Sequence, residues 1–151
     1  MSGIIGGAGS KSGVIGETEL DYEEGTWTPL FADAASGGNT QAGHTGTSGE
    51  YTKVGRAVTI TALAYVNTLG SLDGDIYIRN LPFTTGHYAT IPINGVDLNI
   101  DAGETPIGYV GHGVDYITMK LYDSAAGSTP LHSTELSSDG DFYFSFVYHT
   151  A

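Results

Sequence analysis

Phosphate binding is the first chemistry that the residue types and spacing suggest. The segment 6–12, GGAGSKS, resembles a phosphate-binding loop, but Ile5 and Ser10 occupy the two positions where that loop requires glycine. No strand pattern precedes the segment and no helical pattern follows it, although the loop needs both. We therefore interpret it as part of a glycine-rich arm and not as a nucleotide site.

A cation site is the second possibility, because oxygen-bearing side chains alternate along one short segment. Asp97, Asn99 and Asp101 resemble the start of a calcium-binding loop. Ala102 stands where the sharp turn of that loop needs glycine, and Gly108 stands where the closing bidentate glutamate belongs. The alternation instead favours a solvated strand face, so no metal site is predicted here.

The histidines and the acidic residues also lack the spacing of a catalytic or metal site. None of the histidines forms an H-x-H or H-x₃-H pair, although copies of one histidine meeting on a symmetry axis remain an alternative. The five are His44, His87, His112, His132 and His149. An acidic run precedes the first strand pattern, and paired carboxylates hydrolyse sugars, but such a run is more typical of a solvated segment. The run comprises Glu17, Glu19, Asp21, Glu23 and Glu24.

The sequence therefore predicts no enzyme, no catalytic residue and no cofactor. No G-x-S-x-G motif is present to mark a nucleophilic serine. Trp27 and the 10 tyrosines could stack on sugars, but they are equally the expected content of a core and of subunit interfaces. We favour the core and interface reading, because nothing in their spacing marks a binding groove.

Composition limits the fold and the partners. The 151 residues include 23 glycines and no cysteine, which allows one domain without disulfides. The net charge of −12 opposes binding to nucleic acid and to anionic membranes. No apolar run reaches the 18 residues that a membrane-spanning helix needs, so membrane insertion is not expected.

Residues from Leu20 onward follow the period-two pattern of half-buried strands. The longer predicted strands are 56–67, 74–80, 115–122 and 141–149, and the shorter ones are 25–32, 49–55, 89–100 and 106–111. The polar stretch 33–49 is predicted to be a long loop. Many short strands separated by glycine turns favour an all-β, antiparallel β-sandwich of jelly-roll type, in a domain over residues 20–151.

Several predicted strands also carry apolar or aromatic residues on their second face. These residues are Leu63, Tyr65, Tyr77, Tyr116, Tyr143 and Val147. A monomer would expose them, whereas an oligomer would bury them.

Residues 1–19 are predicted to form an extended N-terminal arm that docks on a neighbouring protein. Glycine and serine dominate the arm, so it cannot bury enough apolar surface to fold alone. Two apolar pairs interrupt it and are the predicted docking residues, namely Ile4, Ile5, Val14 and Ile15.

Three motifs resemble a domain of tailed-bacteriophage virion proteins. Residues 20–29, LDYEEGTWTP, look like its opening, and 49–55, GEYTKVG, and 80–83, NLPF, look like later segments in the same order. The resemblance covers about residues 20–151 and implies a jelly-roll-like sandwich that forms homotrimers. It implies a role in the fold or the trimer interface for Tyr22, Trp27, Pro29, Tyr51, Leu81, Pro82 and Phe83.

The resemblance implies a virion structural protein on the outer surface of the particle, assembled in the host cytoplasm. The chain starts with Met1 and has no long shaft, which favours a trimeric capsid decoration protein, such as a head fibre or cement protein. Its partners would be its own copies and the major capsid protein or another virion protein. The alternative is a tail-fibre or receptor-binding tip that contacts a host surface glycan.

Overall fold

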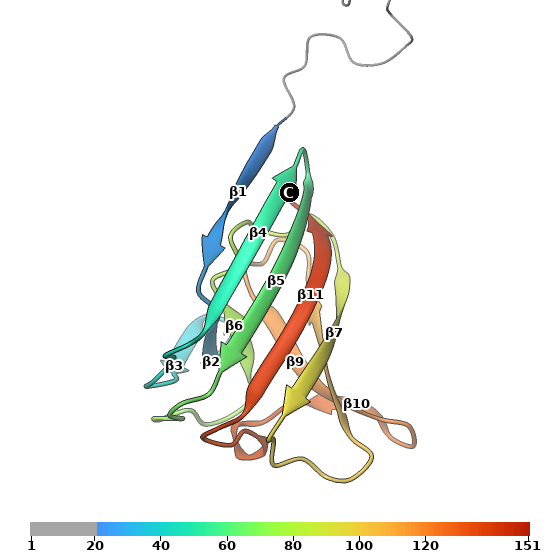
Figure 1. The fold of residues 1–151 in the computed structure, drawn as a ribbon. Coiled ribbons are helices and arrows are strands. Elements are labelled where there is room, and N and C mark those ends of the chain that lie inside the picture. Colours follow the sequence, from blue (N-terminus) through green and yellow to red (C-terminus); the bar gives the residue numbers. More distant parts are fainter. Residues whose placement is uncertain (1–20) are drawn as a thin grey trace, which may run out of the picture.

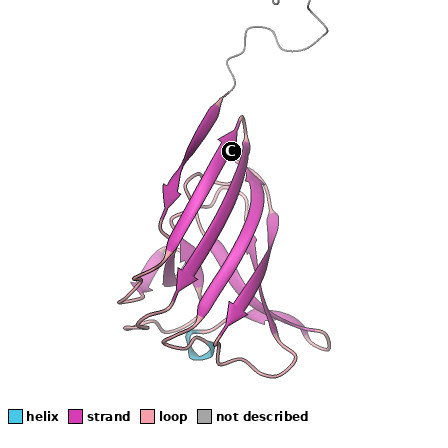
Figure 2. Ribbon diagram, in the orientation of Figure 1, coloured by secondary structure: helices cyan, strands magenta, loops and turns pink. Residues whose placement is uncertain are grey.

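The computed structural model describes residues 21–151, which fold into antiparallel strands and one short 3₁₀ helix (Figure 1, Figure 2). The strands are β1 (Tyr22–Trp27), β2 (Leu30–Ala34), β3 (Gly37–Thr40), β4 (Ser48–Val54), β5 (Ala57–Tyr65), β6 (Tyr77–Arg79), β7 (Ala89–Val96), β8 (Thr105–Val110), β9 (Ile117–Asp123), β10 (Gly127–Pro130) and β11 (Asp141–His149). The helix, η2, spans Ser133–Glu135. The all-β, antiparallel prediction is confirmed, while the jelly-roll connectivity and the trimer remain predictions.

One curled sheet forms both layers of the molecule. The front layer in Figure 1 runs in the order β1-β4-β5-β11-β7, and the back layer continues as β7-β8-β9-β6-β2-β3, with β10 also paired to β9. Strand β7 joins the layers because its residues 93–96 pair with β11 and its residues 89–92 pair with β8. The fold therefore has two outer surfaces, one on each layer.

The core lies between the two layers and is filled by alternate residues of each strand. On β11, Phe142, Phe144, Phe146 and Tyr148 point inward and are buried, as the alternation predicts. Phe142 packs against Phe31 of the back layer, with ring centroids 5.3 Å apart. Burial of each large apolar side chain stabilises the fold by about 1.5–3 kcal/mol. Inward residues of other strands complete the core, among them Val58, Ile60, Ile78, Ile91, Ile117, Met119 and Leu121.

Three sequence predictions about the strands are wrong. The predicted strand 25–32 is two strands, because the chain leaves the front layer after Trp27 and enters the back layer at Leu30. The predicted loop 33–49 contains β3 and the start of β4. The predicted strand 89–100 ends at Val96, because Asp97 has a left-handed backbone with φ of 54° that a regular strand excludes.

Candidate interaction surfaces

The three sequence motifs meet at one end of the molecule. Tyr51 of β4 packs edge-on against Phe83, with ring centroids 5.2 Å apart, and its hydroxyl donates a hydrogen bond of 2.8 Å to Glu23 Oε1 on β1. This hydrogen bond is the main cause that raises the pKa of Tyr51. Lys53 Nζ lies 2.6 Å from Asp21 Oδ2 and 5.7 Å from the centre of the Phe83 ring. We call Glu23, Tyr51, Lys53 and Phe83 the end cluster.

The end cluster ties β1 and the β4–β5 hairpin to the last strand. The Tyr148 hydroxyl of β11 donates to the Phe83 carbonyl at 3.0 Å, and the Phe83 amide donates to the same hydroxyl at 3.3 Å. Burial raises the pKa of Tyr148 to about 12. These contacts explain why the motifs contain Glu23, Tyr51 and Phe83, since each residue holds neighbouring segments together. The contacts assign a catalytic role to none of the three.

Two glycines in the motifs allow aromatic rings to lie directly on the backbone. A Cβ on Gly25 would lie 2.8 Å from the Tyr51 hydroxyl oxygen, and a Cβ on Gly49 would lie 2.6 Å from Trp27 Cδ1. Both distances are shorter than the van der Waals contact of about 3.5–4.0 Å between carbon atoms. The Trp27 ring is 7% exposed and packs against Phe144.

The other motif residues occupy different environments. Pro29 and Leu81 are buried, and Pro82 is half-buried in the loop after β6. Tyr22 is 54% exposed, and its hydroxyl donates a hydrogen bond of 2.5 Å to Glu24 Oε2. Tyr22 and Glu24 therefore belong to an outer surface and not to the core.

Residues 21–151 contain no group of three metal-ligating side chains close enough to share an ion. His87 and His112 do lie together, with ring centroids 6.2 Å apart, but no third ligand from this part of the chain joins them. The segment 97–101, considered above as a calcium loop, uses its Asn99 amide to donate to the Thr134 carbonyl. No helix within residues 21–151 is long and apolar enough to cross a membrane.

The outer surface of the front layer carries little charge over the neighbouring strands β5 and β11. We call the outward residues of β5 and β11 the front face, and they are Ala57, Thr59, Thr61, Leu63, Tyr65, Asp141, Tyr143, Ser145, Val147 and His149. They lie side by side because Leu63 pairs with Tyr143, and Thr59 pairs with Val147, across the two strands. Asp141, at the start of β11, carries the one carboxylate in this set, although the whole chain has 17 acidic residues.

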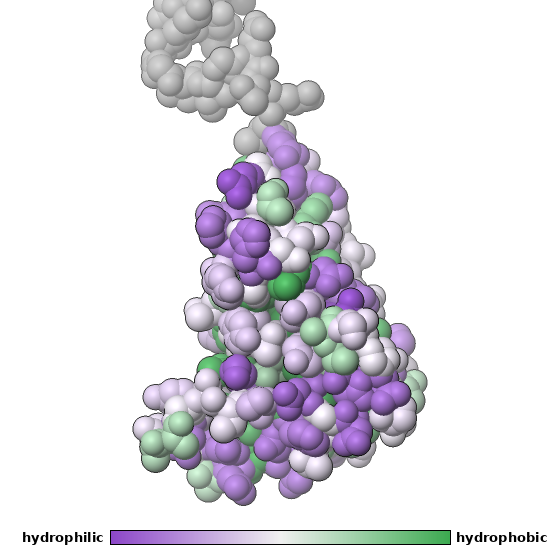
Figure 3. Space-filling view, turned by 180° about the vertical axis from the view of Figure 1, so that it is seen from behind, coloured by the Kyte–Doolittle hydropathy of each residue, from purple (hydrophilic) through white to green (hydrophobic). Residues whose placement is uncertain are grey.

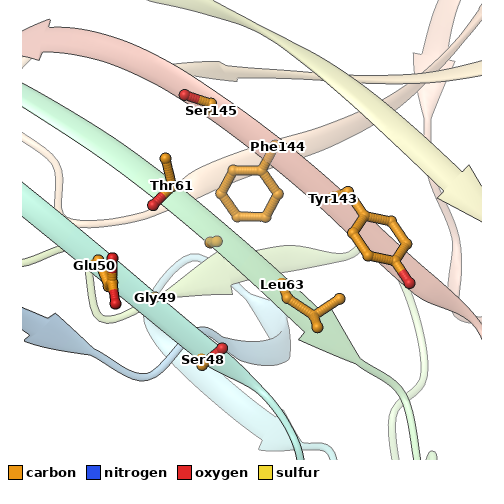
Figure 4. Close-up of a pocket in the computed structure, with 9 residues that line it drawn as sticks. Ser48, Gly49, Glu50, Thr61, Leu63, Tyr143, Phe144 and Ser145 are labelled. Carbon is orange, nitrogen blue, oxygen red and sulfur yellow. The ribbon is translucent and has the colours of Figure 1, made fainter.

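A shallow hollow of about 500 Å³ opens on the front face (Figure 4). Its lining includes Thr61, Leu63, Tyr143 and Ser145, with Glu50 of β4 at the rim. Desolvation, followed by the nearby Asp141 carboxylate, raises the pKa of the Tyr143 phenol, so this ring stays neutral. A hollow that is open and partly apolar, with one carboxylate in its lining, suits packing against another protein better than it suits catalysis.

The structure divides the six residues that were predicted to form one oligomer surface. Leu63, Tyr65, Tyr143 and Val147 lie on the front face. Tyr77 of β6 and Tyr116 before β9 lie in the back layer, with ring centroids 5.5 Å apart. The threonines and serine between the front-face residues were missed by the sequence analysis. Scarcity of charge at the alternate positions of β5 and β11 is the signal that identifies them.

The predicted docking residues Ile4, Ile5, Val14 and Ile15 lie outside the described residues, as does the segment 6–12. The described chain begins beside the β4–β5 hairpin and ends near the same hairpin (Figure 1). The Thr150 amide donates to the Arg56 carbonyl there, at 2.8 Å.

Comparison with known proteins shows a likeness of fold. No protein-family model matches the chain, and no curated protein sequence matches it. Among solved structures, the Dettilon tailspike protein is similar, with a TM-score of 0.68 and 16% sequence identity. The match covers 85% of this chain and 24% of the tailspike chain, so this chain spans about a quarter of that protein's length. The tailspike therefore contains a β-domain of the same fold.

Proposed function

We propose that this chain is a homotrimeric structural module of a tailed-phage particle, in which three copies associate through the front face. The observation that carries the proposal is the scarcity of charge over β5 and β11, where Asp141 at the start of β11 supplies the one carboxylate, in a chain with a net charge of −12. Like charges repel, so copies of such a chain associate best where carboxylates are few. The front face also exposes Tyr143 and Val147, by 41% and 53%, which association would remove from water.

The particle assignment is supported by the fold shared with a tailspike domain and by the motif resemblance. The tailspike likeness favours a tail location, where the module would contribute to attachment. The head location, as a capsid decoration protein, is the alternative that the motif resemblance favours. In both locations, residues 1–19 would bind another virion protein through their apolar pairs.

Sedimentation velocity and light scattering of the purified chain test the trimer. We expect a mass of about 47 kDa, three times the 15.7 kDa of one chain. Val147→Glu should dissociate it, because it places a carboxylate in the middle of the front face. Tyr122→Glu on β9 is the matched control, because it adds the same charge to an exposed residue of the back layer. A monomeric wild-type chain, or a trimer that survives Val147→Glu, would contradict the proposal.

Immunogold labelling of purified particles tests the location. An antibody against the chain should label particles of the virus that encodes it, either along the tail or over the head. Labelling of the tail supports attachment and labelling of the head supports decoration. A chain that is present in infected cells but absent from purified particles would refute the particle assignment.

A further inference from the structure

The back layer presents a lysine that forms no ion pair with any residue in 21–151. Lys120 lies in the middle of β9, where Met119 and Leu121 are buried on either side and the lysine itself points outward. The other lysine in this part of the chain, Lys53, is paired with Asp21. An unpaired cation is unexpected in a chain with 17 acidic residues.

Uncharged residues surround Lys120 on all the neighbouring strands. Strand pairing places Ile107 of β8 on one side of it and Pro130 of β10 on the other. Tyr109 and Tyr122 are the next outward residues, diagonally across β8 and along β9. Ile107, Tyr109 and Lys120 line an open hollow of about 560 Å³ that extends across β7 to Pro92.

A second hollow continues the first along β7. It has a volume of about 590 Å³ and shares Thr90 and Tyr109 with the hollow at Lys120. Tyr88, which is 76% exposed, lies at its far end beside Val147. We call the two hollows together the back trough. Figure 3 views the molecule from behind, where pale and hydrophobic surface lies between hydrophilic regions.

We infer that the back trough binds a saccharide carrying a carboxylate. Exposed Tyr88 and half-buried Tyr109 line the trough, and exposed Tyr122 lies beside Lys120 on β9. Such rings pack against the apolar faces of sugar rings while their hydroxyls reach polar groups. Lys120 supplies the charge-assisted hydrogen bond that recognises a carboxylate. A few polar groups within a mostly apolar lining fix the orientation of a ligand, and the two adjoining hollows give room for more than one sugar unit.

The charges of the chain and of the trough argue against nucleic acid and against a second copy of this chain. These are the two other ligands that tyrosines beside a lysine suggest. Nucleic acid carries one phosphate per nucleotide, and the trough has one cation on a chain of net charge −12, so a polyanion is repelled. A second copy packed symmetrically on this surface would bring two lysines together and bury them without partners. A saccharide with sparse carboxylates matches both the single cation and the rings.

The inference rests on Lys120 and on the rings of β8 and β9, which lie outside the front face, and Val147 is the residue that both surfaces share. Loss of saccharide binding with an intact trimer, and loss of the trimer with intact binding at Lys120, are therefore separate results. The probes are a hyaluronan hexasaccharide and 3′-sialyllactose, each with an uncharged match: the hexasaccharide with its carboxylates reduced to alcohols, and lactose. Binding to the full chain is followed by amide chemical shifts and by calorimetry. A carboxylated probe should shift the resonances of β8 and β9, and its uncharged match should bind about tenfold more weakly or worse.

Variants of the full chain identify the residue that reads the charge. Lys120→Gln should weaken binding of the carboxylated probe about tenfold and leave the uncharged match unaffected, and Lys120→Arg should restore most of the loss. Arg56→Gln is the matched control, because it removes one positive charge from the β4–β5 turn, outside the trough. Its affinity should stay within about twofold of wild type, a change of less than 0.5 kcal/mol in binding energy.

Three outcomes would overturn the inference. The first is that neither carboxylated probe shifts the β8 and β9 resonances. The second is that single-stranded DNA binds more tightly than both probes. The third is that Lys120→Gln changes the sedimentation mass, which would make the back trough an interface between copies of this chain.

Discussion

Close contact between Gly49 and Trp27 leads to a prediction about stability that can be worked out from the structure. The built Cβ of an alanine at position 49 would lie 2.6 Å from Trp27 Cδ1 and 2.7 Å from Cε2. The indole cannot move away freely, because it is 7% exposed and packs edge-on against Phe144 at 6.4 Å. Gly49→Ala should therefore strain the packing of β1 on β4 and on the core.

The coupling energy between Gly49→Ala and Trp27→Ala follows from the separate cost of each substitution in stability. Overpacking of a core by one methyl group costs about 1–3 kcal/mol. Trp27→Ala removes the indole and costs about 3–5 kcal/mol through lost burial and a cavity. In the double variant the alanine at position 49 enters the space that the indole leaves, so the overpacking cost disappears. The double variant should be no less stable than Trp27→Ala alone, which gives a coupling of about 1–3 kcal/mol.

Urea denaturation of the wild type, both single variants and the double variant measures this coupling. All four are compared at one protein concentration, because association stabilises the folded state. Gly111→Ala is the control, since a Cβ there meets its nearest atom at 3.8 Å, an ordinary contact, and its cost should be near zero. If the two single effects add to within about 0.5 kcal/mol, the contact does not constrain the fold and the reasoning is wrong.

Three further predictions concern Tyr148, the arm and Asp33. Burial raises the pKa of Tyr148 from 10.0 to about 12, and the unfolded chain ionises first, so the contribution of Tyr148 to stability should be constant below pH 10 and should be lost between pH 10 and about 12. Urea midpoints measured across this range should decline less in Tyr148→Phe than in the wild type. Deletion of residues 1–19 should abolish binding to particles in a pelleting assay while leaving the thermal transition and sedimentation mass unchanged. Hydrogen bonds from the Asp73 amide and from Asn39 lower the pKa of Asp33, so stability should fall as acid protonates it, and the acid transition of Asp33→Ala should lack this component.

Alternation of residue types predicted the long strands because one side of each strand is buried. Strand β11 was predicted with its observed bounds, since its four inward aromatic residues leave no other register. Strands β3 and β10 gave no such signal, because β10 is exposed along its whole length and β3 has no buried residue. Alternation also does not show which strands pair with each other. The sequence therefore could not show that Ile107, Lys120 and Pro130 lie side by side.

Tyrosine content alone does not distinguish the two outer surfaces, because both layers carry exposed or half-exposed rings. The position of charge does distinguish them. Packing copies through the front face buries threonine, serine and valine, with Asp141 at the start of β11 as its one carboxylate, so little is lost to desolvation. Packing copies through the back layer would bury Lys120, and a buried charge without a partner costs about 3–5 kcal/mol. A trimer built on the back layer would therefore need a carboxylate from a neighbouring copy within 4 Å of Lys120 Nζ. If the assembled structure shows that pair, the assignment of the two surfaces has to be reversed.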